Sequence, residues 1–209
     1  THDIPRAITT LVGNGMLYNA YEWIWDIGNK DRNWQNAHDS TFTHSDYKKG
    51  KELLKSALSI LYFLPGNPCI FYGDEVGLYG YKDPWNRKTY PWKNEDEDMI
   101  EFYKEAINTR KKYSVLTNGD TEFIDTNDDD VFGYIRFNDK CEKILILINR
   151  SLENKNISIN IKENTLEIVD IKYSSKKYLE FISKEEEEFN LQISPKSFNI
   201  FNVINHIEV

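Results

Sequence analysis

The segment that decides the fold runs from Gly66 to Gly77 and reads GNPCIFYGDEVG. A short apolar run, Pro68 to Tyr72, ends at a glycine, and two acids, Asp74 and Glu75, follow directly. A buried parallel strand delivers polar residues to a site at its carboxyl end in this way. The segment therefore predicts a short buried strand over residues 68–72, with a polar loop after it.

Helical patterns lie on both sides of this segment. Residues 46–63 place Leu and Ala at helical spacing, and Pro65-Gly66 ends the pattern. Residues 96–112 form a second amphipathic pattern, with acids in the first turn and basic residues in the last, as the helix dipole favours. A shorter helix is expected over residues 5–11, where Asp3 is available as a cap. The first half of the chain thus alternates between helix and strand.

The composition changes near residues 113–119, where we place a domain boundary. Beyond it, short alternating segments are separated by Asn and Asp residues, which are common in turns. About eight strands in roughly 90 residues are typical of a β-sandwich. The expected strands are 122–125, 131–138, 143–149, 156–161, 167–172, 178–181, 189–193 and 197–203. The glutamate run at 185–188 is expected to be a solvated turn between two of them.

The composition excludes several classes of protein. Of the 209 residues, 40% are hydrophobic and 14% aromatic, which is enough for a core and argues against global disorder. No apolar run approaches the roughly 20 residues of a membrane span. The net charge of −8 argues against nucleic acid or an anionic membrane as a partner. Cys69 and Cys141 predict neither a disulfide framework nor a metal site, and Cys69 is expected to be buried and inert.

The first six residues, THDIPR, extend the pattern to the amino end. Together with residues 66–77 and the DPWNR of residues 83–87, they resemble the α-amylase superfamily, glycoside hydrolase family 13. The resemblance implies an α/β plus all-β fold. Residues 1–115 would form the last two βα units of a (β/α)8 TIM barrel, and residues 118–209 the antiparallel β-sandwich called domain C. A complete barrel takes about 250 residues, so this chain cannot close one alone.

The resemblance also implies a catalytic role near the amino end. Retaining glycoside hydrolases hold two carboxyl groups about 5–5.5 Å apart, one as nucleophile and one as acid/base. The family places these, an Asp and a Glu, after the fourth and fifth barrel strands, which would lie upstream of Thr1. His2 and Asp3 resemble its fourth signature region, which implies that Asp3 stabilises the transition state and His2 contacts a sugar hydroxyl. The alternative is that Asp3 only caps a helix, and Thr1 departs from the family's usual Asn.

Arg6 and Arg87 are candidate substrate-binding residues. Arg6 could instead pair with a carboxylate or be a surface charge, and Arg87 could form a salt bridge with Asp83 that shapes its loop. Asp74 and Glu75 are neighbours along an extended segment, so their side chains point opposite ways and are poorly placed to flank one bond. We interpret these two acids and Asp83 as residues that hold the structure of the loops.

Residues 13–45 lack a clear period and are rich in aromatic side chains. Because the helix after them must lead away from the catalytic face, this loop is expected to begin and end on that face. Flat rings can stack on glucose rings, which makes Trp23, Trp25 and Trp34 candidate substrate-binding residues. The alternative is that the rings form the loop's own small core.

Residues 125–130 read DTNDDD and are rich in oxygen ligands. They lack the Gly and the terminal Glu of an EF-hand loop, so a solvated hairpin turn is expected there. No phosphate-binding loop or zinc cluster is recognisable. We therefore predict no cofactor and no metal from these residues, although calcium is an option for a full enzyme of the family.

The resemblance implies that the parent protein hydrolyses α-1,4-glucosidic bonds of starch, maltodextrin or cyclodextrin, and that this chain alone is inactive. Relatives that cut α-1,6 bonds or transfer glycosyl groups are further options. The expected partners are α-glucan oligosaccharides and, as an option, a second copy of the chain, but neither nucleic acid nor a membrane. The alternative function is a non-catalytic glucan-binding, accessory or dimerisation domain. The cellular location stays open, with the cytoplasm slightly favoured.

Overall fold

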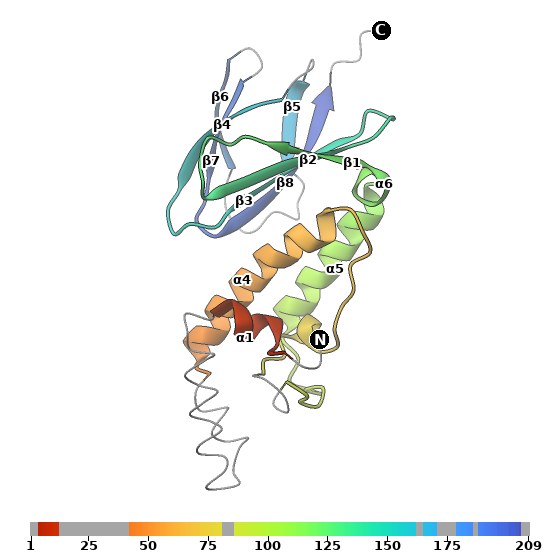
Figure 1. The fold of residues 1–209 in the computed structure, drawn as a ribbon, viewed down its shortest axis with the longest axis vertical. Helices are drawn as coiled ribbons and strands as arrows, with labels where there is room; N and C mark the ends of the chain where they lie inside the picture. The colour runs from red at the N-terminus through yellow and green to blue at the C-terminus, as the bar shows by residue number, and fades with distance from the viewer. Residues whose placement is uncertain are drawn as a thin grey trace, which may run out of the picture. The chain divides into compact units, whose positions relative to one another are not determined.

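The fold was analysed in a computed structural model of the chain (Figure 1). The structure describes residues 4–12, 42–80, 86–161, 165–170, 179–185 and 188–205. Contacts between residues divide the chain into a first unit, residues 1–57 and 68–104, and a second unit, residues 58–67 and 105–209. The predicted domains, 1–115 and 118–209, stay a prediction.

Helices form where the periodicity of the sequence predicts them. Helix α1 spans Ala7–Val12, α4 spans His44–Phe63 and α5 spans Glu97–Lys112. A short helix that the pattern did not predict, α6, spans Val115–Asn118. Within the described ranges, no helix combines the length and the apolar character that crossing a membrane requires.

Side-chain caps fix where the two long helices begin. Thr43 precedes α4, and its Oγ1 accepts a hydrogen bond of 3.1 Å from the backbone N–H of Asp46. In return, Asp46 Oδ2 accepts one of 3.1 Å from the backbone N–H of Thr43. This reciprocal cap explains why α4 begins two residues before the predicted start. Asp96 caps α5 in a similar way, because its Oδ1 accepts a hydrogen bond of 3.1 Å from the N–H of Met99.

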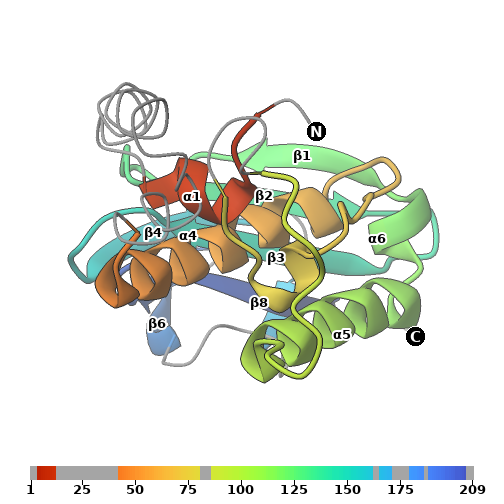
Figure 2. The same ribbon diagram turned by 90° about the horizontal axis from the view of Figure 1, so that it is seen from below.

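Helix α1 lies against α4 in the first unit, as Figure 2 shows. The contact is close because Gly50 of α4 has no side chain. A Cβ at this position would lie 2.7 Å from the carbonyl oxygen of Ile8 and 2.7 Å from Cγ2 of Val12. Both apolar side chains are buried there. This packing holds the short α1, which is too short to be stable by itself.

The strand predicted over residues 68–72 does not form. Cys69 and Ile70 of this run are exposed, and the expectation that Cys69 is buried is therefore wrong. A buried parallel strand needs a neighbouring strand for its N–H and C=O groups, and no described strand pairs with this run. The polar loop after it does form, as the 3₁₀ helix η1 over Asp74–Val76. Asp74 and Glu75 therefore lie on a helical turn, and the expectation that they are neighbours along an extended segment is wrong.

All eight predicted strands form in the second unit, with ends shifted by a few residues. They are β1 Asp120–Ile124, β2 Val131–Phe137, β3 Lys143–Asn149, β4 Lys155–Asn160, β5 Thr165–Asp170, β6 Leu179–Glu185, β7 Glu188–Ile193 and β8 Ser197–Asn205. A five-stranded sheet has the order β1-β2-β3-β8-β5, and a three-stranded sheet the order β4-β7-β6. Every pairing is antiparallel (Figure 1).

The two sheets share one apolar core. It draws alternate residues from both sheets: Val131, Ile135, Leu145, Leu147, Ile157, Ile159, Ile161, Phe189, Leu191, Ile193, Phe201 and Val203. Alternation of this kind is what directs one face of each strand inward. The shared core agrees with the sandwich that the alternating pattern predicted.

In the second unit, two arginines donate hydrogen bonds to carbonyl groups at the end of α4. The last carbonyls of a helix have no partner within the helix. The guanidinium of Arg110 donates hydrogen bonds to the carbonyl oxygens of Tyr62 and Gly66, and that of Arg136 donates to the carbonyl of Phe63. Residues far apart in the sequence thereby replace the missing partners.

Candidate functional site

Arg6 is the centre of a buried polar cluster in the first unit. Arg6 is 2% exposed, and its side chain contacts two loops. Nε donates a hydrogen bond of 2.9 Å to the carbonyl oxygen of Asn86, and Nη1 donates one of 2.7 Å to that of Tyr72. Nη1 also lies 3.5 Å from Oδ1 of Asp74. The guanidinium therefore fixes the segment around Arg6 to the loop that follows the apolar run.

Aromatic rings complete the surroundings of this guanidinium. The Cζ atom of Arg6 lies 4.4 Å from the ring centroid of Phe71 and 4.4 Å from that of Tyr72. A planar cation over ring faces is attracted by the ring electrons, more strongly where water is excluded. The apolar run thus supplies ring faces to the cation instead of forming a strand.

Further hydrogen bonds hold the neighbours of Arg6. Its backbone N–H donates to the carbonyl of Gly80 at 2.8 Å, and the N–H of Gly80 donates to Oγ1 of Thr9 at 2.9 Å. The side-chain amide of Asn86 donates to the carbonyl of Ile4 at 2.8 Å. Residues 4–9 are therefore fixed on both sides of Arg6, directly after the predicted catalytic segment 1–3.

The loop that carries Asp74 depends on two glycines. Gly73 has φ 88° and Gly77 has φ 71°, a region that other residues rarely adopt. At Gly77, a Cβ would also lie 2.0 Å from the hydroxyl of Tyr47. The motif GDEVG is thus required by the shape of the turn, which presents Asp74 to Arg6.

Burial dominates the electrostatics of Asp74. Its side chain is 17% exposed, and this burial raises the pKa of the carboxyl from 3.8 to about 6. The positive charge of Arg6 lowers the pKa, and the negative charge of Glu75 raises it further. Within the described residues, two buried atoms of the cluster, Nη2 of Arg6 and Oε2 of Glu75, have no hydrogen-bond partner. The cluster therefore retains the two N–H groups of Nη2 of Arg6 as donors, and Oε2 of Glu75 as an acceptor.

The structure places only some of the predicted site residues. Those outside the described residues are His2, Asp3, Trp23, Trp25, Trp34 and Asp83. Arg6 and Asp74 come together, and Arg6 has a carboxylate partner rather than a position on the surface. Arg87 is exposed, and its predicted partner is one of the residues outside the description. The substrate-binding roles stay predictions.

Sequence reasoning missed Asn86, which is 1% exposed and bonds both Ile4 and Arg6. A small polar residue between two large ones in DPWNR is the only signal that could have pointed to it. Asn86 forms hydrogen bonds with residues about eighty positions earlier in the chain. A local sequence pattern cannot predict contacts over this distance.

The acidic loop of residues 125–130 joins β1 to β2, as predicted for a hairpin. Its charges are balanced by basic side chains. Nζ of Lys155 lies 3.1 Å from Asp128 and 3.0 Å from Asp130, and Nε of Arg150 lies 3.1 Å from Asp130. In the part of the chain that the structure describes, no group of three or more His, Cys, Asp or Glu side chains could hold a metal ion.

Comparison with known proteins shows to which class of protein this chain is similar. No protein-family model matches the chain. Its relatives among curated proteins are glycoside hydrolases of family 13, the α-amylase family, and the chain matches a partial region of these longer proteins.

Two relatives illustrate the match. An amylopullulanase from Thermoanaerobacter thermohydrosulfuricus is 46% identical over 76 residues, which are 36% of this chain and 5% of the relative. A cyclomaltodextrinase from Geobacillus thermopakistaniensis is 30% identical over 158 residues, which are 74% of this chain and 26% of the relative. The chain thus spans only a small part of the length of either protein.

Among solved structures, a maltogenic amylase from S. marinus is similar with a TM-score of 0.57 and 24% sequence identity. The match covers 97% of this chain and 21% of that chain. At this identity the likeness concerns the fold. The mixed α/β chain with antiparallel sheets corresponds to a part of a family 13 enzyme.

Proposed function

We propose that this chain is the carboxyl-terminal part of a retaining α-glucan hydrolase that cleaves α-1,4-glucosidic bonds of starch, maltodextrin or cyclodextrin. The observation that carries the proposal is the attachment of the segment after THD to the GDEVG loop by Arg6. The names of the relatives, cyclomaltodextrinase and amylopullulanase, agree with a glucan substrate. In this proposal, residues 1–115 are barrel units and residues 118–209 are domain C.

Asp3 is the catalytic residue that we assign to this chain, with His2 as a contact for a sugar hydroxyl. A carboxylate held near the reacting sugar stabilises the positive charge of the transition state. In this proposal, Arg6, three residues after Asp3 and four after His2, positions both residues. Its buried donors are directed at carbonyl oxygens, which favours a positioning role over direct contact with substrate. The nucleophile and the acid/base would come from sequence that precedes residue 1.

The proposal is tested on the protein encoded by the complete gene. Its sequence should contain an Asp and then a Glu at barrel strand ends upstream of this chain. The protein should hydrolyse maltohexaose, and Asp3→Asn should lower kcat by on the order of 100-fold or more with a smaller change in KM. Asp139→Asn, in an exposed turn, is the matched control and should leave both constants unchanged.

Two results would overturn this function. The first is a complete gene without the upstream pair of acids. The second is an active protein in which Asp3→Asn retains the kcat of the parent. The isolated 209-residue chain should show no turnover, because proximity of all three carboxylates is what lowers the barrier.

A further inference from the structure

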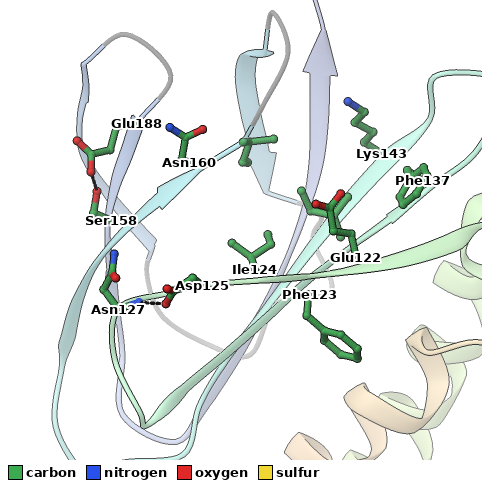
Figure 3. A pocket seen from close by; sticks show the side chains of 12 residues that line it. Glu122, Phe123, Ile124, Asp125, Asn127, Phe137, Lys143, Ser158, Asn160 and Glu188 are labelled. Carbon is green, nitrogen blue, oxygen red and sulfur yellow. Dashed lines mark hydrogen bonds between the residues drawn. The ribbon is translucent and has the colours of Figure 1, made fainter.

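A pocket of about 550 Å³ opens between β1 and β4, the end strands of the two sheets (Figure 3). Its volume lies within the roughly 300–1,000 Å³ that small-molecule sites occupy. All residues that line it belong to the second unit. No residue that we assign to the proposed cleavage reaction takes part in it.

The floor of the pocket is apolar. Ile135 and Ile161 are 8% and 3% exposed and belong to the core between the sheets. Ile124 and Phe137 are partly buried hydrophobic side chains that pack against the same core. Figure 3 shows Ile124 on the pocket side of β1, whereas the ring of Phe123 points to the opposite side. The floor therefore offers an apolar surface to one face of a ligand.

The rim of the pocket is polar and carries negative charge. Glu122, Asp125 and Glu188 contribute carboxylates, and Lys143 is the one cation among the described residues of the lining. The hydroxyl of Ser158 donates a hydrogen bond to Glu188, which holds that carboxylate at the rim (Figure 3). Carboxylates are strong acceptors for hydroxyl donors. An excess of acids disfavours an anionic ligand.

We propose that this pocket binds a neutral, polyhydroxylated ligand, whose C–H faces lie on the isoleucine floor and whose hydroxyls donate to the rim carboxylates. Together the described residues contain no group of three or more His, Cys, Asp or Glu that could hold a metal ion. The choice of a short α-glucan as this ligand rests on the proposed function. The pocket itself is a second, non-cleaving site.

The probe is maltotriose, titrated into the 209-residue chain while backbone amide shifts are followed by NMR. We expect saturable shifts at the pocket side of β1 and at β4. Ile124→Trp fills the pocket and should weaken binding at least about tenfold, and Glu188→Gln should weaken it by several-fold through the loss of a charged acceptor. Phe132→Leu, at an exposed position of β2 that is not part of the lining, should leave the dissociation constant unchanged. Glucose 6-phosphate should bind more weakly than glucose.

The proposal is overturned by an absence of saturable shifts, by shifts confined to the first unit, or by unchanged binding in Ile124→Trp with an intact amide spectrum. An extended peptide that gives saturable shifts at the pocket while maltotriose gives none would also overturn it. Hydrolysis by the longer protein is a separate measurement. Loss of pocket binding in an active hydrolase refutes the pocket alone, and pocket binding by an inactive parent refutes the proposed reaction alone.

Discussion

Asp74 shows that burial can outweigh a neighbouring positive charge. Arg6 is close, but the shortest hydrogen bond of its Nη1 is to the carbonyl of Tyr72, at 2.7 Å, and the carboxylate lies 3.5 Å away. Loss of water around the carboxyl is therefore the largest influence on its pKa, which rises to about 6. A carboxyl with such a pKa takes up a proton on folding in mildly acidic solution.

The first prediction concerns the pH dependence of this residue. The pKa of Asp74 is raised in the folded chain, from 3.8 to about 6, so the folded state binds the proton more tightly. The stabilisation is full below pH 3.8 and is lost as the pH rises through 6. Relative to the parent chain, Asp74→Asn should gain up to about 2 kcal/mol of unfolding free energy between pH 4.5 and 7.5. Urea unfolding at the two pH values measures this gain.

Asp98 provides a control of opposite sign. Hydrogen bonds from Lys55, and then from Lys51, lower the pKa of Asp98 to about 2, although burial opposes them. Its stabilisation is present above pH 3.8 and is lost only as the pH falls toward 2. The difference between Asp98→Asn and the parent should therefore be constant from pH 4.5 to 7.5. An equal gain in both variants would contradict the assignment to Asp74.

The second prediction concerns the shape of the Arg6 side chain. Its fork reaches the carbonyls of Tyr72 and Asn86 together, and a lysine ammonium cannot reproduce this geometry. Arg6→Lys should lower the unfolding free energy by about 3 kcal/mol, because buried acceptors lose their donors. Arg87→Lys, at an exposed position, should change it by less than about 0.5 kcal/mol. Denaturant unfolding of both variants decides, and equal losses would refute the prediction.

At the scale of elements, the start of α4 is fastened to the start of α5. The hydroxyl of Tyr47 donates a hydrogen bond of 2.7 Å to Oδ2 of Asp96, and Nζ of Lys51 lies 3.0 Å from the same oxygen. Burial, followed by this hydrogen bond, raises the pKa of Tyr47. The hydrogen bonds from Tyr47 and Lys51 lower the pKa of Asp96 against the effect of its burial. Asp96 therefore caps α5 and also binds two side chains of α4.

The third prediction tests this connection by a double-mutant cycle. Tyr47→Phe removes one donor and should cost about 1 kcal/mol of unfolding free energy. Asp96→Asn should cost more, because it removes the ion pair with Lys51 and the negative charge at the start of α5. The pair should show a coupling energy of roughly 1 kcal/mol, measured from the urea unfolding of the parent, both single variants and the double variant. Additive losses would show that the two side chains act independently.

Local sequence patterns predicted most elements but failed at one. The helix over residues 46–63 and the strand over 143–149 depend on side-chain periods that lie within each segment, so they could be predicted. The run 68–72 has a strand's composition, but a strand also needs a neighbour. None of the described strands provides one, and the run is left as an irregular segment with exposed Ile70. The residue composition of a segment does not show whether a neighbouring strand is present to pair with it.

At the scale of the whole molecule, the same limit applies to the candidate site. The resemblance of THDIPR to a known signature made Arg6 a candidate site residue, and its position in a pair of adjacent acids made Asp74 one. The burial of Arg6 could not be predicted, because its partners, Tyr72 and Asn86, are 66 and 80 residues away. The pocket between β1 and β4 was equally hidden, since it exists only once two sheets have formed. Sites of this kind arise from long-range contacts.

The last prediction concerns Arg136, which is fully buried and joins distant parts of the second unit. Its guanidinium donates to the carbonyls of Phe63 and Leu116, and also to that of Gly119 at 2.6 Å. Arg136→Met preserves most of the volume but leaves these oxygens without donors, so unfolding free energy should fall by at least about 3 kcal/mol. Arg150→Met removes only an exposed ion pair and should cost less than about 1 kcal/mol. Equal urea midpoints for the two variants would mean that the carbonyls find other donors, and that Arg136 does not hold this unit together.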